Sequence, residues 1–369
     1  MTSISFTGDI AFSKYFKDKW KEDFLDEKVV EFLTSSNHVV ANVEAPLTAR
    51  TVDSDREINH LCSPKAGEWF QKISANIWTI ANNHILDCGE EGMVDTISVA
   101  KKYGAMTVGA GINQKEAEKP VIIDSEGGIG IIAVTYKRGE FIRATEDSAG
   151  CVLFDEPKKI KSIIEKVKAK NRWCVVIAHG GDEFSHLPLP YIKKLYKKFL
   201  KMGADVVVGH HPHVVQNYEK VGDKAIFYSL GNFVFDTDYQ RKQKHSEYGI
   251  LLKLHFSKDK FEWEYLATKV NRSSQRIETT VPPEIFCEIG KKQYKLLWPL
   301  VARLFTENFV VAKTFAIPKT RNYTKKQWFN FHKEKIGLKN ALCVYLGKAI
   351  SYLSLWKRAP ENLKNYLLK

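Results

Sequence analysis

The chain has 369 residues, of which 44% are hydrophobic and 27% charged, and this balance excludes a disordered or collagen-like protein. The six cysteines form no CxxC pair, which argues against a finger-type zinc site or a disulfide scaffold and favours a reducing cytoplasm. No apolar run is long enough to cross a bilayer, and the sequence opens without the pattern of a secretory signal.

Positive charge is concentrated at one end of the chain. Residues 281–369 contain 14 Lys and 3 Arg against 5 Glu, a net charge of +12, whereas the first 280 residues have a net charge of only +1. Such a change in composition along the sequence predicts a domain boundary.

The first 270 residues alternate short β-branched runs with helical patterns. Strands are expected at six apolar runs, Ser3–Thr7, His38–Asn42, Asn76–Ala81, Ile129–Thr135, Trp173–Ala178 and Asp205–Val208. Helices are predicted at 157–170 and 188–202, because each begins with proline and repeats its apolar residues every three to four positions. Gly203 suits the left-handed cap at the end of the second helix.

After the sixth of these strands, the pattern changes to paired strands. The segments 214–221 and 224–229 predict one hairpin, and 248–256 with 261–270 predict another. Alternating strands and helices followed by antiparallel strands indicate the α/β class, as a layered α/β sandwich with mixed sheets.

Three histidines, His210, His211 and His213, follow the strand predicted at 205–208. Side chains of extended backbone repeat every two residues, so His211 and His213 are expected to face the same side. The carboxyl ends of strands in an α/β sheet face the usual ligand crevice. A polar turn with imidazoles bonded to the backbone is the alternative, but three histidines in four positions favour metal binding.

Four further strand ends carry residues of the same kind. They are His179, the group Asn83, His84 and Asp87, then Glu44, and Asp9. Taken singly, such a residue is more often a turn residue or a helix cap than a ligand. Five such strand ends together predict a metal site, and the mixture of oxygen and imidazole donors suits a divalent Mn, Fe or Zn ion.

These motifs occur in a fixed order along the chain. They are Gly8-Asp9, Asn42-Val43-Glu44-Ala45-Pro46, Asn82-Asn83-His84 with Asp87, His179 with Gly181 and Glu183, Gly209 to His213, and Ser229 to Phe233. The order resembles the capsule-synthesis protein CapA family, which is linked to bacterial capsule and poly-gamma-glutamate production within the calcineurin-like metallophosphoesterase superfamily. The resemblance covers about residues 1–270 and implies a metallophosphoesterase-like sandwich with one or two metal ions in a strand-end cleft.

The resemblance also implies a role for each matching residue. Six would be metal ligands: Asp9 and His213 at a first metal, Glu44 as the bridging carboxylate, and Asn83, His179 and His211 at a second metal. Two would be catalytic: His84 would protonate the leaving group, and Asp87 would orient the ring of His84. Four are expected to bind substrate, namely Asn42, Glu183, His210 and Asn232.

One position departs from the superfamily pattern, because Ala11 stands where a histidine is expected two residues after the first aspartate. The second metal site keeps all of its expected ligands, whereas the first keeps only Asp9, Glu44 and His213. This departure bears on the mechanism, because a two-metal mechanism needs both ions. Two functions follow. The first, toward which we lean, is a metal-dependent hydrolase or transferase in the biosynthesis of a capsule or exopolymer, which is polysaccharide or poly-gamma-glutamate. The second is a non-catalytic assembly or anionic-polymer-binding factor that works with a membrane synthase.

We assign the sandwich domain to 1–270, interpret the polar, proline-containing segment 271–283 as a linker, and expect a basic amphipathic helical extension over 284–369. Lysine beside apolar helical faces with tryptophan is typical of an interfacial membrane helix, and a cap packed on the domain is the alternative. Expected partners are an anionic polymer or phosphorylated substrate, and a membrane surface or synthase; no nucleic acid is expected. The implied location is cytoplasmic, with peripheral attachment at the inner membrane face.

Overall fold

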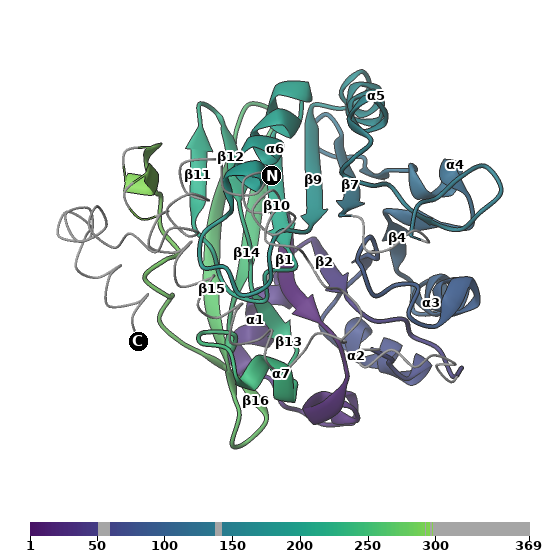
Figure 1. Ribbon diagram of the computed structural model, residues 1–369, viewed down its shortest axis with the longest axis vertical. Helices are drawn as coiled ribbons and strands as arrows, with labels where there is room; N and C mark the ends of the chain where they lie inside the picture. The colour runs from purple at the N-terminus through teal and green to yellow at the C-terminus, as the bar shows by residue number, and fades with distance from the viewer. Residues whose placement is uncertain (51–59, 137–141, 292, 296, 298–369) are drawn as a thin grey trace, which may run out of the picture.

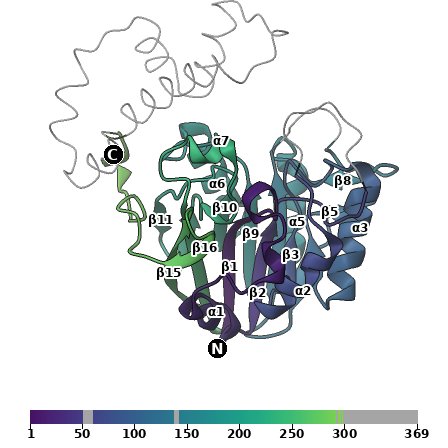
Figure 2. The same cartoon turned by 90° about the horizontal axis from the view of Figure 1, so that it is seen from below.

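The computed structural model describes residues 1–50, 60–136, 142–291, 293–295 and 297. Within them, two mixed β-sheets lie face to face, and helices cover their outer sides (Figure 1). The larger sheet has the strand order β16-β15-β14-β1-β2-β3-β4, with β13 paired to β1, and the smaller has the order β11-β12-β10-β9-β7-β6. Figure 2 shows β15, β1, β2 and β3 of the larger sheet from left to right, and β14 lies between β15 and β1.

The strands of the larger sheet are β1 (Thr2–Ile10), β2 (His38–Val43), β3 (Ile77–Thr79), β4 (Met106–Val108), β13 (Asn232–Val234), β14 (Tyr248–Phe256), β15 (Phe261–Asn271) and β16 (Arg276–Thr279). Those of the smaller sheet are β6 (Val121–Ile123), β7 (Ile129–Thr135), β9 (Trp173–His179), β10 (Val206–His210), β11 (Tyr218–Val221) and β12 (Lys224–Phe227). A separate pair is formed by β5 (Ala110–Gly111) and β8 (Gly150–Cys151).

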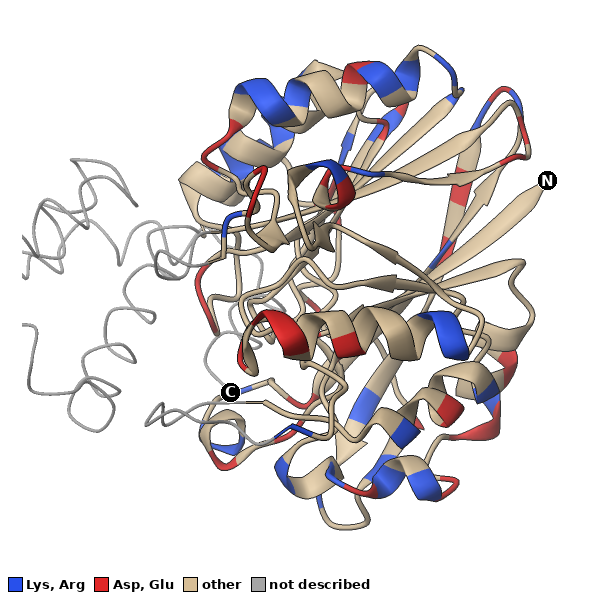
Figure 3. Ribbon diagram, turned by 90° about the vertical axis from the view of Figure 1, so that its right-hand side faces the viewer, with Lys and Arg blue, Asp and Glu red and all other residues tan. Residues whose placement is uncertain are grey.

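The α-helices are α1 (Glu27–Thr34), α2 (Gly67–Lys72), α3 (Gly89–Lys102), α4 (Gln114–Ala117), α5 (Pro157–Lys168), α6 (Pro190–Met202) and α7 (Asp238–Arg241). Three short 3-10 helices are η1 (Lys14–Phe16), η2 (Lys19–Lys21) and η3 (Pro64–Ala66). Proline at the first position starts α5 and α6, and Gly203 ends α6 with a φ of 120°. Figure 3 shows the ribbon of α5 along the top of the molecule, with its lysine positions in blue.

The layers follow from the alternation of side chains along each strand. In β9, Val175 and Ile177 belong to the core between the sheets, whereas Cys174 and Val176 face a second core beneath α5 and α6. The helices bury their apolar stripes in that second core, including Ile164 of α5. Both faces of the smaller sheet are therefore covered, as expected for strands that read as continuous apolar runs.

The carboxyl ends of parallel strands from both sheets meet at one edge of the sandwich. β1, β2 and β3 run parallel within the larger sheet, and β9 and β10 run parallel within the smaller. Gly209 is required in β10 because a Cβ there would lie 2.0 Å from the carbonyl oxygen of Tyr228. Beyond Gly209, His210 and the backbone N–H of His211 contact Asp9 near the end of β1.

The predicted fold class, a layered α/β sandwich with mixed sheets, is confirmed. Each of the six predicted strands is present, and both predicted hairpins form. The segment 271–283 differs from the predicted linker, because its residues Arg276–Thr279 form β16 and pair with β15. Its polar residues alternate with the fully buried Ile277, and a pattern this short does not distinguish an edge strand from a linker.

Most of the predicted extension, 284–369, lies outside the described residues, so the division into domains stays a prediction. Among the helices that the structure describes, none combines the length and the apolar character needed to cross a bilayer.

Candidate metal centre

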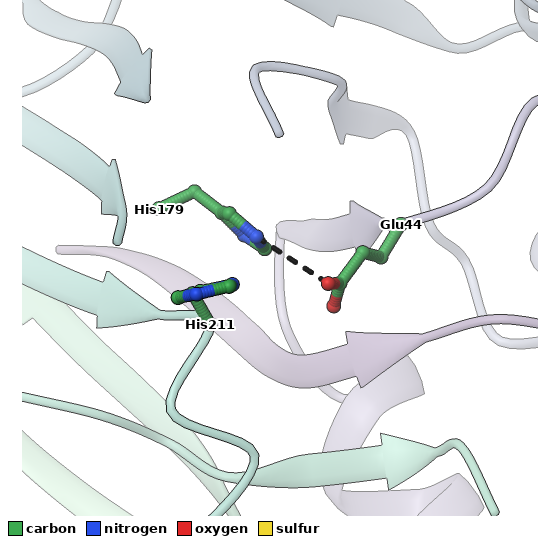
Figure 4. Close-up of side chains that lie close together, drawn as sticks. All are labelled: Glu44, His179 and His211. Carbon is green, nitrogen blue, oxygen red and sulfur yellow. Dashed lines mark ion pairs between the residues drawn. The ribbon is translucent and has the colours of Figure 1, made fainter. Parts of the chain in front are cut away.

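A cluster of buried polar side chains occupies the edge where the strands of the two sheets meet. Glu44 follows β2, His179 ends β9, and His211 follows β10, and the three point toward one another (Figure 4). The Nε2 atom of His179 lies 3.4 Å from Oε1 of Glu44 and 2.8 Å from Oδ1 of Asn83. Two neighbouring ligands of one octahedral metal ion are separated by about 3 Å, so these spacings suit a shared ion.

A second group of potential ligands shares Glu44 with the first. Asp9, Glu44 and His213 offer donor atoms within 4.8 Å of one another, as do Glu44, His179 and His211. Nε2 of His213 lies 3.5 Å from Oε1 of Glu44. Glu44 therefore stands between the two groups, in the position expected of a bridging carboxylate.

Asp9 lies at the centre of a hydrogen-bond network that orients the histidines. Its Oδ1 accepts from Nδ2 of Asn42 at 2.7 Å and lies 3.1 Å from Nδ1 of His210. Its Oδ2 accepts from the backbone N–H of His211 at 3.3 Å and lies 3.1 Å from Nδ1 of His213. Burial favours a neutral Asp9, but hydrogen bonds from His210 and His213 outweigh it and hold the pKa of this carboxyl well below its ordinary value.

Two of the histidines have left-handed backbone. His211 has a φ of 92° and His213 a φ of 56°, a region that residues with a Cβ rarely adopt. Such strain persists only where the surrounding structure fixes it, and it is concentrated at functional sites. The backbone N–H of His211 on Asp9 and the side chain of Asn232, which donates to the carbonyl of His213 at 3.2 Å, provide that restraint.

The electrostatics differ between the two groups of ligands. Burial lowers the pKa values of His179 and His211 well below the ordinary value, so both are neutral, the form in which imidazole binds a metal. For His213, burial is outweighed by the carboxylates of Glu44 and Asp9, which raise its pKa to about 10. A metal at the Asp9 side must therefore displace a proton from His213, whereas one at the His179 side need not.

The residues fit a metal ion at the His179 side. The Nδ1 atom of His211 is buried and makes no hydrogen bond within the described part of the chain, which is costly unless something else satisfies it. Neutral imidazoles, a carboxylate and an amide oxygen form the mixed nitrogen and oxygen donor set that Mn, Fe and Zn accept. At the Asp9 side, Ala11 is fully buried and adds no donor.

A histidine and an aspartate lie beside the cluster in the arrangement used for proton transfer. Nδ1 of His84 lies 2.7 Å from Oδ2 of Asp87, and the same oxygen accepts from the backbone N–H of His60 at 2.9 Å. The ring of His60 packs against that of His84 with 4.4 Å between centroids. Asp87 therefore fixes both the orientation of His84 and the loop that carries His60.

A cavity of about 400 Å³ opens over this edge of the sandwich. Among the predicted residues, His84, Glu183 and His213 line it. The lining also includes residues that the sequence analysis did not identify, among them His60, Lys14, Lys17, Phe184, Phe235 and Tyr239. They come from loops, a 3-10 turn and the short helix α7, whose sequences carry no motif that predicts a common cavity.

The four predicted substrate-binding residues do not share one environment. Glu183 lines the cavity, and a carboxylate oxygen of Glu183 lies within 4.8 Å of ring nitrogens of His211 and His213. Asn42, His210 and Asn232 are each 1% exposed and bond to Asp9 or His213 behind the cluster. Their positions suit orientation of the ligands, and their contact with substrate stays a prediction.

The fold and the cluster define a layered α/β protein with a candidate metal centre at its strand ends. The model of the bacterial capsule synthesis protein family PGA_cap matches residues 3–237, so this chain belongs to that family, and the predicted resemblance is confirmed.

The PGA biosynthesis protein CapA of Bacillus subtilis is 31% identical over 65% of this chain and 64% of its own length. The capsule biosynthesis protein CapA of Bacillus anthracis is 29% identical over 65% of this chain and 61% of its own length. The chain thus spans slightly less than two thirds of each of these relatives.

A solved structure of a candidate 5'-nucleotidase from Staphylococcus aureus is a more distant likeness. Its TM-score is 0.46 at 13% identity, over 82% of this chain and 59% of that chain.

Proposed function

We propose that this protein acts in the biosynthesis of a bacterial capsule or related exopolymer, polysaccharide or poly-gamma-glutamate, as a metal-dependent hydrolase or transferase. The observation that carries the proposal is the buried cluster of Glu44, Asn83, His179 and His211. His84, which is paired with Asp87, lines the cavity that opens beside this cluster. Family membership supports the capsule role, and the names of the Bacillus relatives add poly-gamma-glutamate as one polymer.

In this proposal each group has one task. Glu44, Asn83, His179 and His211 hold a Mn, Fe or Zn ion, and Asp9 keeps His210 and His213 in place. The bound ion supplies Lewis-acid activation of the substrate. Because Nδ1 of His84 is hydrogen-bonded to Asp87, a proton passes to a leaving group through Nε2.

The free thiols of Cys62, Cys88, Cys151, Cys174 and Cys287 support a cytoplasmic location.

Metal content tests the proposal first. Full-length protein purified without chelator should contain close to one equivalent of transition metal, and His179→Ala should lose most of it because a ligand that lies between Glu44 and Asn83 is removed. The matched control is His255→Ala, since His255 lies on β14 and pairs with Glu264 at 3.0 Å, outside the cluster. Wild-type protein that takes up no metal on titration would remove the basis of the proposal.

Turnover separates catalysis from metal binding. On a chromogenic phosphodiester, His84→Asn should reduce turnover by about 10²–10⁴-fold while metal content stays at the wild-type level. If metal-loaded wild-type protein shows no turnover, the second function is favoured, a non-catalytic factor that binds an anionic polymer. Two observations point to that function: Ala11 adds no ligand, and Asp9 already accepts four hydrogen bonds.

A further inference from the structure

The cavity over the metal centre has two chemically different parts. His84 and His213, at 3% and 5% exposure, form its floor, next to the cluster. Lys14 and Lys17 also line it, and both are exposed, so they lie at its rim. A molecule that reaches the cluster through this cavity must pass two ammonium groups.

The turn that carries these lysines is held firmly in place. Tyr15, between them, donates its hydroxyl to Oδ1 of Asp238 at 2.6 Å, and the guanidinium of Arg241 stacks 3.3 Å from the centre of its ring. Phe16 is fully buried in the core. Lys14 has a φ of 48°, a left-handed conformation that an ordinary surface lysine does not need. The protein thus fixes the backbone so that both lysines face the cavity.

Two carboxylates, Glu183 and Asp238, line the same cavity as these lysines, but Asp238 already accepts the hydroxyl of Tyr15, and Glu183 lies beside His211 and His213. Within the described residues neither Lys14 nor Lys17 forms an ion pair, whereas their neighbours Lys19 and Lys21 pair with Glu22 and Asp18 at 2.6 and 2.8 Å. Lys14 and Lys17, which form no ion pair among the described residues, stand at the rim of this cavity, and their ammonium groups attract an anionic group that enters it.

We propose that Lys14 and Lys17 form an anion-binding subsite for carboxylate or phosphate groups, which holds a second anionic group of the substrate while the first lies at the metal centre. The inference rests on the proposed function, because it takes the cavity to be the place where the substrate binds. It restricts the substrate to molecules with repeated anionic groups, such as an acidic polymer, and makes the two lysines determinants of specificity.

Binding of short probes tests this subsite. Tri-gamma-glutamate and inorganic phosphate are titrated separately into Mn²⁺-loaded full-length protein, because a long polyanion would also bind the basic residues after Val281. The double variant Lys14→Ala, Lys17→Ala should bind the trimer about tenfold more weakly, with a smaller loss of affinity as salt rises. Lys14→Arg, Lys17→Arg should restore most of the affinity, and Lys19→Ala, Lys21→Ala is the matched control.

The outcomes are distinct. Weaker binding of the trimer in the alanine variant indicates carboxylate recognition, and weaker binding of phosphate indicates recognition of a phosphorylated substrate; either supports the subsite. Equal affinity of the wild-type and alanine proteins for both probes would overturn it. Metal content is measured on the same samples, so a failure of the proposed metal centre appears as metal-free wild-type protein, separately from a failure of the lysine subsite.

Discussion

The buried residue His186 makes the stability of this fold depend on pH. Its side chain is 8% exposed, and its ring lies 5.3 Å from that of His245. Burial, reinforced by the charges of His245 and Lys244, lowers the pKa of His186 to about 3. The residue is thus neutral in the folded protein at pH values where the unfolded chain binds a proton.

The sign of the effect follows from proton linkage. Between the ordinary histidine pKa of about 6.5 and the folded value of about 3, the unfolded state binds more protons, so stability falls as pH is lowered through this range. The contribution of His186 is fully present above pH 6.5 and decreases by on the order of 3 kcal/mol by pH 4. We predict that His186→Asn loses less stability over this range than wild-type protein.

Urea unfolding at a series of pH values measures this difference. Other buried groups titrate in both proteins, so the comparison uses the slopes of the two profiles rather than the absolute free energies of unfolding. Parallel profiles would show that His186 does not titrate as this environment requires.

At the scale of elements, β16 changes the boundary that the sequence predicts. Ile277 is fully buried, its backbone N–H donates to the carbonyl of Phe24 at 2.8 Å, and its own carbonyl accepts from Asp26 at 2.9 Å. The backbone N–H of Thr279 donates to Oδ2 of Asp26 at 2.9 Å. β16 therefore connects β15 to the segment before α1 and belongs to the folded domain.

Two substitutions inside the predicted linker test this assignment. Ile277→Ala should lower the free energy of unfolding by about 2–5 kcal/mol, because it leaves a cavity in the core. Val281→Ala, four residues further, should change it by less than about 0.5 kcal/mol, since Val281 is 80% exposed. Chemical denaturation of the full chain measures both, and similar small effects would favour the linker interpretation.

The sequence predicted elements whose apolar pattern can be read locally, and it missed features that depend on distant contacts. β7, β14 and β9 have enough apolar residues for their periodicity to be read without tertiary contacts, and polar residues after buried strands indicated the ligand edge. By contrast, β16 and the turn of Lys14 depend on contacts with residues about 250 and 220 positions away. The sequence also could not reveal that Asn42, His210 and Asn232 lie behind the ligands. The spacing of motifs predicts which residues lie at strand ends, but it does not predict how deeply each side chain is buried.

At the scale of the whole molecule, charge is divided between the described domain and the residues that follow it. Residues 298–369, which lie outside the described part, contain 11 Lys and 3 Arg against 3 Glu. An enzyme or assembly factor that works with a membrane synthase must operate beside an anionic leaflet. We propose that these basic residues bring the protein to that surface, and that the alternative, a cap packed on the domain, would leave the lysines in solvent.

Vesicle co-sedimentation compares the full chain with a chain that ends at Leu297, which retains β16 and the buried Leu297 side chain. The full chain should bind anionic vesicles, because each lysine near such a surface adds about 1 kcal/mol, and rising salt should weaken this part of the binding. Burial of tryptophan and leucine would add a part that salt does not remove. The shorter chain should stay in solution and keep its metal, which serves as the control for folding. Equal sedimentation of the two chains would instead favour the packed cap, since the basic residues would then contribute nothing to the attraction.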